Sequence, residues 1–418
     1  MGGELCVVGV LPRISRERFA AVLAAAGSPA ASEADACWAA VASEGVDPLF
    51  ALAIFHHESR FGTVGLVPRY DLKNPGATRT SRTGEGDAVS VPGRGQFWRY
   101  PTWEAGFRDL ARRLVDPGFV YRRQGAEIVE AIVPRWAPAA DGNDPAAYTA
   151  ALRAFVTRHA EEPLPGISLR IDWVARGRGN RPGLALRPEW ITIHETANEA
   201  PGADAEAHRR FVHAGGGREG VSFHFVVDDR EVVQLLPTTE IGWHAGDGPN
   251  GPGNRSSLAI ELCVHAGSDW QRTQEHGAQL AAVLCQAFQL GPERVVPHQR
   301  WSGKRCPRRL LASGFAGFQQ RVAALLAVRA GRFFPETGQW VRGDFLTFCE
   351  QRGGLELFGY PLSSEQREQC EDGHEHLVQW FERACLERHD ELPPGQQVLL
   401  RRLGAELLAR RRAEGGDG

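Results

Sequence analysis

The sequence predicts a multidomain chain. We expect a mainly α-helical N-terminal domain, an α/β middle domain with a mixed sheet, and a small α/β or α-helical C-terminal module. The chain has 418 residues, which is too long for one ordinary core. Up to about residue 160 apolar residues recur at helical spacing, whereas short β-rich runs separated by Gly, Pro, Asn and Asp begin near residue 189.

Composition and charge exclude several classes of protein. Hydrophobic residues make up 42% of the chain and charged residues 24%, and the net charge is -3. Because a nucleic-acid-binding protein usually carries a strong basic excess, we expect no nucleic-acid partner. No run of 18 apolar residues occurs, so we also expect no membrane insertion. The sequence does not indicate an oligomeric state.

The N-terminal residues show no export signal. MGGELCVVGVLPRISRERF lacks the basic start, the long apolar run and the small-residue cleavage site of a secretory peptide. Without such a signal, we expect the eight cysteines to be reduced. Most of them are expected to be small buried hydrophobes, because they lie in apolar surroundings.

The first domain is predicted over residues 1–160. Apolar positions recur at helical spacing through ACWAAVA and PLFALAIF. The predicted helices cover residues 33–60, 102–114, 123–132 and 145–159. Residues 78–94 are rich in Gly, Ser and Thr, so we expect a mobile loop there. The Pro-rich stretch EEPLPG at 161–166 is interpreted as the first linker.

The second domain is predicted over residues 167–330. Its β-rich runs are EWITIHE, SFHFVVD, EVVQLL and LAIELCV, at 189–195, 222–228, 231–236 and 258–264. Helices are predicted at 204–213, 273–289 and 315–329. Strands mixed with helices indicate a central sheet covered by helices. The third domain, a small C-terminal module, is predicted over residues 331–412 and ends in an Arg-rich helix.

Three potential zinc ligands fall in the second domain. His194 closes the run WITIH, where alternation can bury Ile191 and Ile193 and point His194 to the opposite face. His298 and Cys306 lie in VVPHQRWSGKRCPRRL, at a spacing that fits a loop folded back on a metal. Hydrolytic zinc sites use three protein ligands and leave one position open. Alone the pattern is weak, because a histidine at a strand end is more often a hydrogen-bonded structural residue.

Five segments around these residues carry a resemblance. ITIHETAN, SFHFVVDDREVVQLLP, IGWHAGDG, GNRSSLAIELCV and VPHQRWSGKRCP resemble, in the same order, the N-acetylmuramoyl-L-alanine amidase family. Its type-2 amidase fold is shared with phage endolysins and peptidoglycan-recognition proteins. The resemblance implies that His194, His298 and Cys306 bind Zn²⁺. It also implies hydrolysis of the amide between the lactyl group of N-acetylmuramic acid and L-alanine of the stem peptide.

Two further residues are predicted to take part in catalysis. Glu261 lies inside the apolar run LAIELCV, an expensive place for a charge unless the site uses it. We interpret it as the general acid/base, and the alternative is a glutamate on the solvent face of an edge strand. Lys304 would stabilise the developing oxyanion, and the alternative is an exposed loop lysine.

The resemblance also bears on three residues near this site. Some family members have Tyr before the histidine of the second strand, where this chain has Phe223. A phenyl ring cannot donate a proton, so more of the proton transfer falls to Glu261. By resemblance, His224 and His244 lie near the same site. We assign both to the substrate cleft, because three ligands and a water fill a tetrahedral shell.

The first domain carries a second potential catalytic residue, Glu58, in HHESRFGTVG. A glycosidase uses a carboxylic acid in an apolar setting, and the alternative is a surface glutamate paired with Arg60. HHESRFGTVG, GQFWRYPTWEAGFRDLARRL and IVPRWAPAADGNDPAAY resemble the lysozyme-like β-N-acetylglucosaminidase family, in which this glutamate is the acid. The domain is therefore expected either to cleave glycan or only to bind it. A second carboxylate cannot be assigned among Asp71, Glu85, Asp87 and Glu104.

The C-terminal module is rich in aromatic residues, which in a small domain usually form the core. Exposed rings that stack on sugars would instead make it a cell-wall-binding module. It also contains residues that suggest a second zinc site, although their spacing matches no established ligand pattern. These residues are Cys370, His374, His376, Cys385 and His389.

Together these observations predict a peptidoglycan hydrolase with Zn²⁺ as cofactor and peptidoglycan as partner. A second, glycan-cleaving activity in the N-terminal domain would make it bifunctional. Two alternatives remain: a non-catalytic peptidoglycan-recognition protein, and a phage-type endolysin whose outer domains only target the wall. We expect the protein to act on the cell wall, either extracellular or released by lysis.

Overall fold

The computed structural model describes residues 4–116, 118, 121, 125–329, 331–393 and 395–414. The chain divides into two compact units, Met1–Leu326 and Ala327–Gly418. The predicted boundary between residues 160 and 167 falls inside the first unit. Within that unit we call residues 4–160 the helical region and residues 167–326 the sheet region, and residues from 327 onward form the C-terminal unit.

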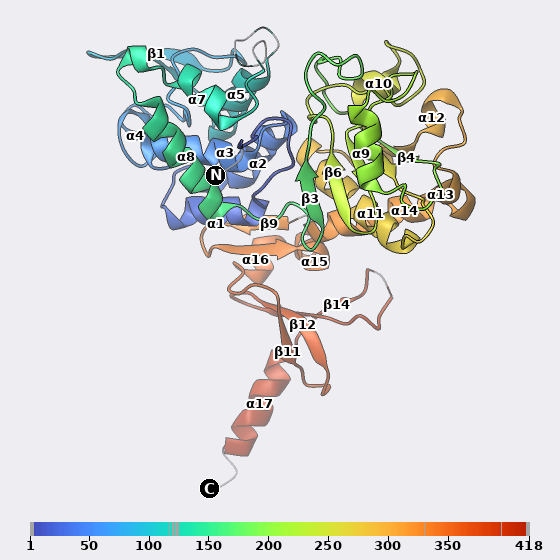
Figure 1. Cartoon of the computed structure of the whole chain (residues 1–418). Coiled ribbons are helices and arrows are strands. Elements are labelled where there is room, and N and C mark those ends of the chain that lie inside the picture. Colours follow the sequence, from blue (N-terminus) through green and yellow to red (C-terminus); the bar gives the residue numbers. More distant parts are fainter. Residues whose placement is uncertain are drawn as a thin grey trace. The chain divides into compact units, whose positions relative to one another are not determined.

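The helical region consists of helices and one β-hairpin. Its α-helices are α1 (Arg16–Ala25), α2 (Ala34–Ser43), α3 (Pro48–Ser59), α4 (Leu66–Arg69), α5 (Trp103–Val115), α7 (Val129–Trp136) and α8 (Pro145–His159). Short 3-10 turns η1 (Ala31–Glu33) and η2 (Ala139–Asp141) and strands β1 (Asp87–Val91) and β2 (Gly95–Arg99) complete it. In Figure 1 these elements run from blue to teal.

Helix α3 is the central helix of this region, and its sequence sets both of its ends. The carboxylate of Asp47 caps it by accepting from the amide of Leu49 at 3.1 Å, and Pro48 occupies the first turn. Arg60 ends the helix in the left-handed conformation, with φ of 45°. Every residue from 48 to 55 is buried, so α3 is surrounded by the other helices.

Several predictions for the helical region need correction. The predicted helix over 33–60 is two helices, because the chain turns between α2 and α3, at Gly45, which has φ of +75°. The segment 78–94, predicted as a mobile loop, leads into and contains most of the hairpin β1–β2, whose strands pair antiparallel. Helix α7 begins at Val129, and residues 123 and 124 of the predicted helix 123–132 lie outside the described residues.

The sheet region is built on six strands in the order β3-β6-β5-β7-β4-β8. Only the β5–β6 pair is antiparallel, so the sheet is mixed. The strands are β3 (Ser168–Ile171), β4 (Trp190–Glu195), β5 (Phe225–Val227), β6 (Glu231–Gln234), β7 (Ser257–Leu262) and β8 (Val295–Pro297). The helices are α9 (Ala205–His213), α10 (Pro252–Ser256), α11 (Trp270–Phe288), η3 (Pro292–Arg294), α12 (Gln299–Ser302), α13 (Arg308–Ser313) and α14 (Phe315–Arg329).

Strand β4, which lies between β7 and β8, is buried on both faces. Ile191 and Ile193 are fully buried, as expected, but Thr192 and His194 on the opposite face are also buried. Helix α11 packs against β4, β5 and β7, and continuous burial of this kind is typical of a sheet with covered faces. His194 therefore points into the interior, not toward solvent.

The helical and sheet regions meet through main-chain contacts as well as side chains. The carbonyl of Gly9 accepts hydrogen bonds from Gln234 Nε2 at 2.6 Å and from the amide of Thr238 at 3.0 Å. Gly9 has φ of +76°, and a Cβ there would approach the Cβ of Pro237 to 2.5 Å. Only glycine fits this contact without displacement.

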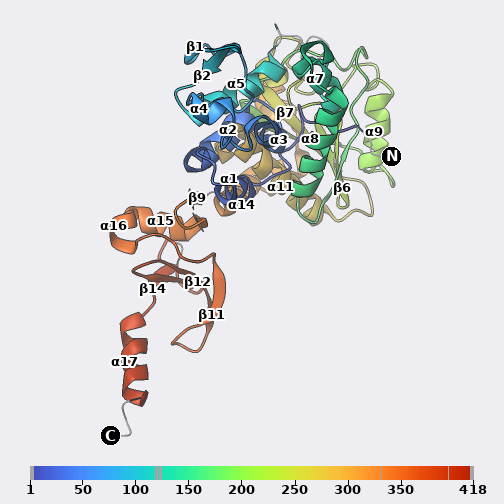
Figure 2. The same ribbon diagram turned by 90° about the vertical axis from the view of Figure 1, so that its left-hand side faces the viewer.

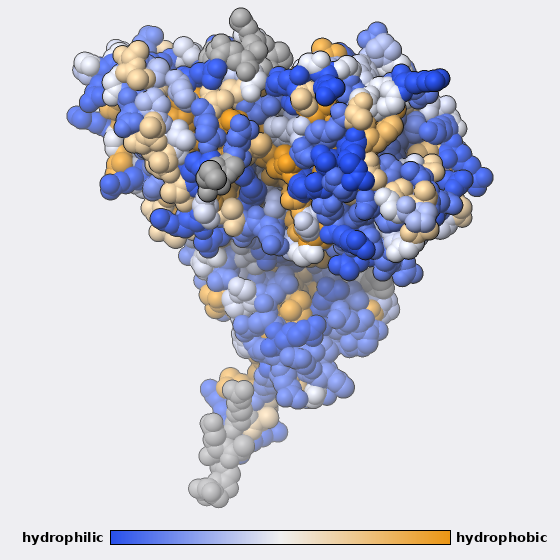
Figure 3. All heavy atoms as spheres, in the orientation of Figure 1, coloured by the Kyte–Doolittle hydropathy of each residue, from blue (hydrophilic) through white to orange (hydrophobic). Residues whose placement is uncertain are grey.

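A buried ion network crosses the same interface. Arg181 of the sheet region donates to Glu240 at 2.8 Å, and it lies 3.4 Å from Glu127 of the helical region. All three side chains are at least nine-tenths buried. The segment 161–166, predicted as a linker, is also packed, because Leu164 is fully buried. Figure 1 shows the two regions side by side, Figure 2 shows the helical region in front of the sheet region, and Figure 3 shows hydrophobic residues where they meet on one face.

The C-terminal unit combines two small sheets with three helices. A hairpin of β9 (Gly331–Phe334) and β10 (Gln339–Arg342) precedes α15 (Gly343–Gln351) and α16 (Gly354–Phe358). An antiparallel sheet follows, in the order β11-β12-β13-β14. Its strands are β11 (Gln366–Gln369), β12 (Glu375–Trp380), β13 (Cys385–Arg388) and β14 (Val398–Leu400), and α17 (Leu403–Glu414) comes last. Phe334, Phe345, Phe358 and Phe381 are buried in its core.

Two general expectations can be compared with the structure. Among the described residues, no helix combines the length and apolar character that a membrane crossing requires. All eight cysteines are free thiols, and each of them except Cys6 is buried. Most cysteines therefore pack as small hydrophobes, as the sequence predicted.

Candidate metal centre and active site

Two strands and one loop bring the predicted zinc ligands together. His194 is the fifth residue of β4, and His298 directly follows β8, which pairs with β4. Cys306 lies on the loop between α12 and α13. The ligand atoms of these three residues all lie within 4.8 Å of one another, and all three side chains are buried. The structure therefore gathers residues that are far apart in the sequence.

The parallel register of β4 and β7 positions the carboxylate. His194 and Glu261 are direct partners in this register, so both side chains point to the same face of the sheet. The Nδ1 atom of His194 lies 3.8 Å from Oε1 of Glu261. A shift of one residue in this pairing would turn Glu261 to the opposite face.

The hydrogen bonds of His298 fix which of its nitrogens can bind a metal. Its Nε2 donates to the carbonyl of Ala245 at 2.8 Å, and Ser302 Oγ lies 3.0 Å from the same nitrogen. In a neutral ring, Nδ1 then carries the lone pair. That Nδ1 atom lies 3.0 Å from Nδ1 of His194.

Glu195 anchors the loop that carries Cys306. Its carboxylate accepts hydrogen bonds from the amides of Arg309 at 2.7 Å and Leu310 at 3.0 Å, at the start of α13. Its own amide donates to Cys306 Sγ at 3.4 Å. The strand end therefore holds the loop on which the thiol lies. Sequence reasoning missed Glu195, although its place directly after His194 was a usable signal.

Burial sets the protonation of the three ligands. It lowers the pKa of His194 and His298, and Lys304 lowers both further. For His298 the bond to the Ala245 carbonyl and the charge of Asp247 oppose the lowering of its pKa without reversing it. Both rings are therefore neutral at physiological pH, which is the form that binds a metal. Burial also raises the pKa of the Cys306 thiol to about 12, so without a cation nearby this sulfur keeps its proton.

Glu261 has the properties of a group that transfers protons. Burial raises its pKa to about 8, the nearby Lys304 ammonium opposes the rise, and the negative charge of Glu195 adds to it. Its Oε2 atom is buried and has no hydrogen-bond partner. Buried polar atoms are usually paired, so this oxygen is available to a ligand or substrate. Lys304 itself is exposed, and its charge acts on Glu261.

His244 lies beside the ligands, whereas His224 does not face them. His244 is buried, its Nδ1 lies 3.1 Å from Nε2 of His194, and its Nε2 has no hydrogen-bond partner. His224 is fully buried, donates to the carbonyl of Glu240 at 2.7 Å and accepts from the amide of Ala259 at 3.0 Å. Since both of its nitrogens bind the backbone, His224 has none left for substrate. We therefore revise its assignment from the cleft to the framework. Phe223 is buried in the core beside it.

The residues present fit a zinc ion. In a tetrahedral site with Zn–N distances of about 2.0–2.1 Å, two ligand nitrogens lie about 3.3 Å apart, close to the 3.0 Å between the Nδ1 atoms of His194 and His298. Two neutral imidazoles and one thiol are also the donor types that zinc prefers. The unpaired oxygen of Glu261 faces the same space as a hydrogen-bond acceptor.

Glu58 lies far from this centre in the helical region. It is half-buried at the end of α3. The Tyr148 hydroxyl donates to its Oε1 at 2.6 Å, and the Trp136 indole donates to the same oxygen at 3.4 Å. Glu58 is thus held by aromatic side chains of α7 and α8. Among the described residues, no contact pairs it with Arg60.

The four residues considered as a second carboxylate each lie beside a basic side chain. Asp87 pairs with Arg99 at 2.8 Å, Glu85 lies 3.4 Å from Arg108, and Glu104 also pairs with Arg108. Asp71 lies 3.9 Å from Lys73. The structure brings none of them into a described contact with Glu58.

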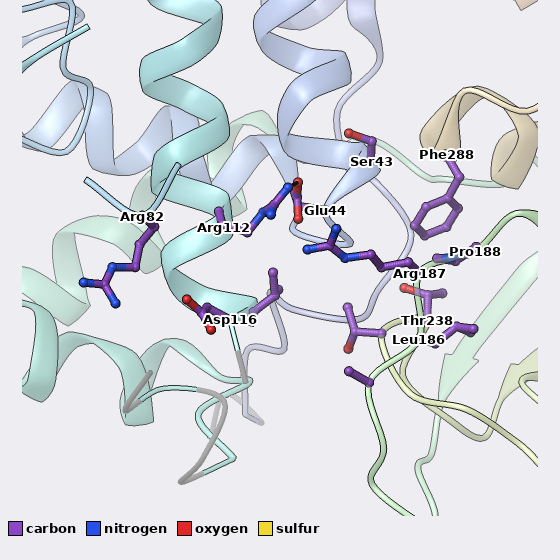
Figure 4. Close-up of a pocket in the computed structure, with 13 residues that line it drawn as sticks. Ser43, Glu44, Arg82, Arg112, Asp116, Leu186, Arg187, Pro188, Thr238 and Phe288 are labelled. Atoms are coloured by element: carbon purple, nitrogen blue, oxygen red, sulfur yellow. Dashed lines mark hydrogen bonds and ion pairs between the residues drawn. The ribbon is translucent and has the colours of Figure 1, made fainter. Parts of the chain in front are cut away.

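A pocket of about 270 Å³ lies elsewhere in the first unit, lined by both of its regions. Figure 4 shows Arg112 beside Glu44, with Arg187 and Thr238 on the opposite side; the Arg112–Glu44 distance is 2.6 Å. No residue predicted from the sequence as a site residue lines this pocket. It is therefore separate from the metal centre.

The comparisons with known proteins concern the sheet region. A family model described as N-acetylmuramoyl-L-alanine amidase matches residues 184–309. The N-acetylmuramoyl-L-alanine amidase CwlH of Bacillus subtilis (strain 168) is 46% identical over 145 residues, which are 35% of this chain and 57% of CwlH. XlyA of the same organism, named likewise, is 47% identical over 140 residues, which are 34% of this chain and 46% of XlyA. The chain thus spans about half the length of these curated relatives.

Two solved structures are also similar to part of the chain. The catalytic domain of XlyA is 43% identical, covers 37% of this chain and 99% of its own, and has a TM-score of 0.36. A mutant endolysin from Bacillus subtilis is 42% identical, with the same coverage and the same TM-score. The family match includes all three predicted ligands and Glu261. Residues 184–309 are therefore a domain of the N-acetylmuramoyl-L-alanine amidase family.

Proposed function

We propose that the chain is a zinc-dependent peptidoglycan hydrolase. It would cleave the amide between the lactyl group of N-acetylmuramic acid and L-alanine of the stem peptide. The observation that carries the proposal is the pairing of His194 with Glu261 at 3.8 Å, beside His298 and Cys306. The family match over residues 184–309 supports the same reaction.

In this proposal His194, His298 and Cys306 hold the zinc ion. When bound, Zn²⁺ would polarise the scissile carbonyl and lower the pKa of water at the open position. Binding also requires Cys306 to lose its proton. The charge of Glu261 is near enough to the thiol to help raise the pKa of Cys306, so we assign the departing proton to this carboxylate.

Glu261 is the residue we assign to proton transfer. Its buried Oε2 has no protein partner, so it can accept a proton from the attacking water and give it to the leaving amine. A nearby dication favours the ionised carboxylate, which offsets the effect of burial on its pKa. The phenyl ring of Phe223 cannot donate a proton, so in this proposal Glu261 alone transfers the protons of the reaction.

Lys304 and His244 are assigned to the substrate. The Lys304 ammonium is close enough to lower the pKa of Glu261, so its charge also acts on an oxyanion formed beside that carboxylate. His244 Nε2 is buried and unpaired, and it can hydrogen-bond a substrate carbonyl or amide. His244 also contacts His194 and thus helps to orient that ring.

A non-catalytic recognition protein is the alternative on the same domain. Two features favour catalysis: Cys306 is retained, and the Oε2 atom of Glu261 is buried without a hydrogen-bond partner. Burying a polar atom without a partner costs free energy, and a protein that only binds peptidoglycan gains nothing from it. The enzyme would meet peptidoglycan outside the cell or after lysis. The other alternative, a phage-type endolysin with outer regions that only target the wall, predicts the same amidase chemistry.

The test is mass spectrometry of peptidoglycan digested by the full chain. Release of stem peptides with a free L-alanine amine would support the proposal. Glu261→Gln should abolish this release while zinc stays bound, and Cys306→Ser should remove both. Cys285→Ser, which changes a buried thiol on α11, is the matched control. Binding of peptidoglycan by the wild type without release of peptides would favour the recognition protein.

The helical region is assigned a second activity on weaker support. Tyr148 and Trp136 hold Glu58 at a half-buried position, as a glycosidase would position its acid. New reducing sugar ends in the same digest, lost on Glu58→Gln while stem peptides are still released, would support glycan cleavage. Unchanged sugar ends would leave this region with glycan binding only.

A further inference from the structure

A second histidine cluster lies in the C-terminal unit, and the amidase chemistry does not use it. We propose that Asp372, His376 and His389, with Glu387 as a fourth ligand, form a binding site for a divalent transition-metal ion of the zinc class. Single ligand atoms of Asp372, His376 and His389 all lie within 4.8 Å of one another. The site is independent of the proposed amidase, because it shares no residue with it.

The strand register creates the cluster. Strands β12 and β13 pair antiparallel with Leu377 opposite Arg388, so the flanking His376 and His389 are also opposite each other. Their ring centroids lie 4.0 Å apart. Asp372 approaches from the turn between β11 and β12 and lies 2.7 Å from His376 Nε2. Glu387 lies 3.1 Å from His389 Nε2.

Both rings are oriented as metal ligands are. His376 Nδ1 lies 3.1 Å from the carbonyl of Arg388, and His389 Nδ1 lies 2.8 Å from the carboxylate of Glu391. A ligating histidine typically donates its second N–H to a carbonyl or carboxylate in this way. The two Nε2 atoms are then left facing the carboxylates of Asp372 and Glu387.

Charge favours a cation in this position. All four ring nitrogens of His376 and His389 face oxygen acceptors. The two Nε2 atoms face the carboxylates of Asp372 and Glu387, so two negative groups border the space beside them. A divalent cation in that space is attracted by both carboxylates.

The donor set indicates the kind of ion. Two imidazoles with one or two carboxylates suit Zn²⁺ and its neighbours Co²⁺ and Ni²⁺, and they disfavour Ca²⁺ and Mg²⁺, which prefer oxygen ligands. Cys370 and Cys385, considered from the sequence, belong to an apolar cluster with Val378. The Cys370 thiol donates to the carbonyl of Glu368 at 3.7 Å and also contacts Glu387. His374 is exposed. A small unit gains stability from such a site, because its core is limited.

The test counts zinc ions in the full chain by elemental mass spectrometry after equilibration with Zn²⁺ and desalting. We expect about two ions per chain in the wild type, about one in His389→Gln, about one in Cys306→Ser, and about none in the combined variant. His374→Ala is the matched control, because it removes an exposed histidine two positions from His376. It should retain both ions.

A milder variant guards against misfolding. Asp372→Asn removes a charged ligand, but its amide oxygen can still accept the hydrogen bond that Asp372 Oδ1 accepts from the amide of His374 at 2.9 Å. It should weaken retention of the second ion by about tenfold or more. A wild-type chain whose zinc count is unaffected by both His389→Gln and Asp372→Asn would overturn the proposal. Failure of the amidase proposal would instead appear as a count unaffected by Cys306→Ser.

Discussion

The two histidine clusters of the chain differ in which of their polar atoms are paired. In the sheet region, Glu261 Oε2 and His244 Nε2 are buried without a hydrogen-bond partner. In the C-terminal unit, every ring nitrogen of His376 and His389 faces an oxygen. Each cluster can hold a cation, but only the first also presents unpaired buried groups.

This difference separates a reactive centre from a structural one. A catalytic metal site keeps an open position and nearby groups that act on the substrate, whereas a structural site is closed by protein ligands. The parallel strands β4 and β7 place Glu261 beside the ligands, and its Oε2 atom has no hydrogen-bond partner. The antiparallel pair β12–β13 instead surrounds its histidines with carboxylates. Reaction chemistry is therefore expected at the first cluster and stabilisation at the second.

The largest expected effect comes from Cys306→Ser. Loss of the zinc ion should lower amidase activity by about a thousandfold or more, because several kcal/mol of charge stabilisation are lost. His389→Gln in the other cluster should leave the released stem peptides unchanged. Quantitative mass spectrometry of the two variants checks the contrast. Equal losses in both would show that the clusters do not divide the roles as proposed.

Glu261→Gln should have the next largest effect. Removal of the general acid/base is expected to lower kcat by about 10²–10⁴-fold. Zinc retention should stay at the wild-type level, since no ligand is changed. Steady-state rates together with the metal content measure both. Loss of zinc along with activity would make Glu261 a ligand instead of the proton-transferring group.

Lys304→Ala should have a smaller effect. A preorganised buried oxyanion donor contributes about 10²–10³-fold to kcat, but Lys304 is exposed and screened, so we expect about a tenfold loss. Lys304→Arg, which keeps the charge, is the control and should recover most of the rate. A full-rate Lys304→Ala enzyme would return this residue to an ordinary loop lysine.

The smallest effect is expected in the pH dependence of the metal-free chain. Burial raises the pKa of Glu261 from 4.5 to about 8, so its contribution to the free energy of unfolding is fully present below pH 4.5. That contribution is lost as the pH rises to 8. Urea denaturation after metal removal should therefore show that Glu261→Gln gains stability relative to wild type between pH 5 and pH 8, by at most a few kcal/mol. A constant difference would contradict the raised pKa.

His389 of the other cluster should give a different pH window. Burial lowers the pKa of His389, but its bonds to Glu387 and Glu391 outweigh that effect and raise it overall from 6.5. Its stabilising contribution is complete below pH 6.5 and disappears as the pH rises through the higher folded value. His389→Gln should therefore change the pH dependence above 6.5 and leave the range from 4.5 to 6.5 unaffected.

Long periodic segments were predictable from the sequence, and short or irregular ones were not. The run 145–159 predicted α8 at its observed bounds, because Asp144 and Pro145 mark its start. Strands β3 and β8 were missed, since four and three residues carry too little alternation. The hairpin β1–β2 was taken for a loop because Gly and Ser dominate its surroundings. Strand β5 begins only at Phe225, so His224 precedes it.

The site itself was predictable in identity and not in geometry. The resemblance named His194, His298 and Cys306, the apolar run LAIELCV indicated Glu261, and the structure gathers all four. The direct pairing of His194 with Glu261 depends on the order β7-β4-β8, which no local pattern reveals. His224 was misplaced because its hydrogen bonds go to main-chain groups of Glu240 and Ala259, distant in sequence. In the second cluster Asp372 was missed, because its approach to His376 depends on a turn.

The buried contact of Arg181 with Glu127 and Glu240 limits how this chain can be divided into separate domains. From the sequence alone, a boundary near residue 167 would be chosen for exchanging domains with another protein. Such a cut would leave a guanidinium and a carboxylate at a newly wetted face, together with the Gln234 amide that now bonds to Gly9. A transplanted sheet region would therefore need its own replacement cover, and hybrids that keep residues 4–160 attached should be the more soluble ones.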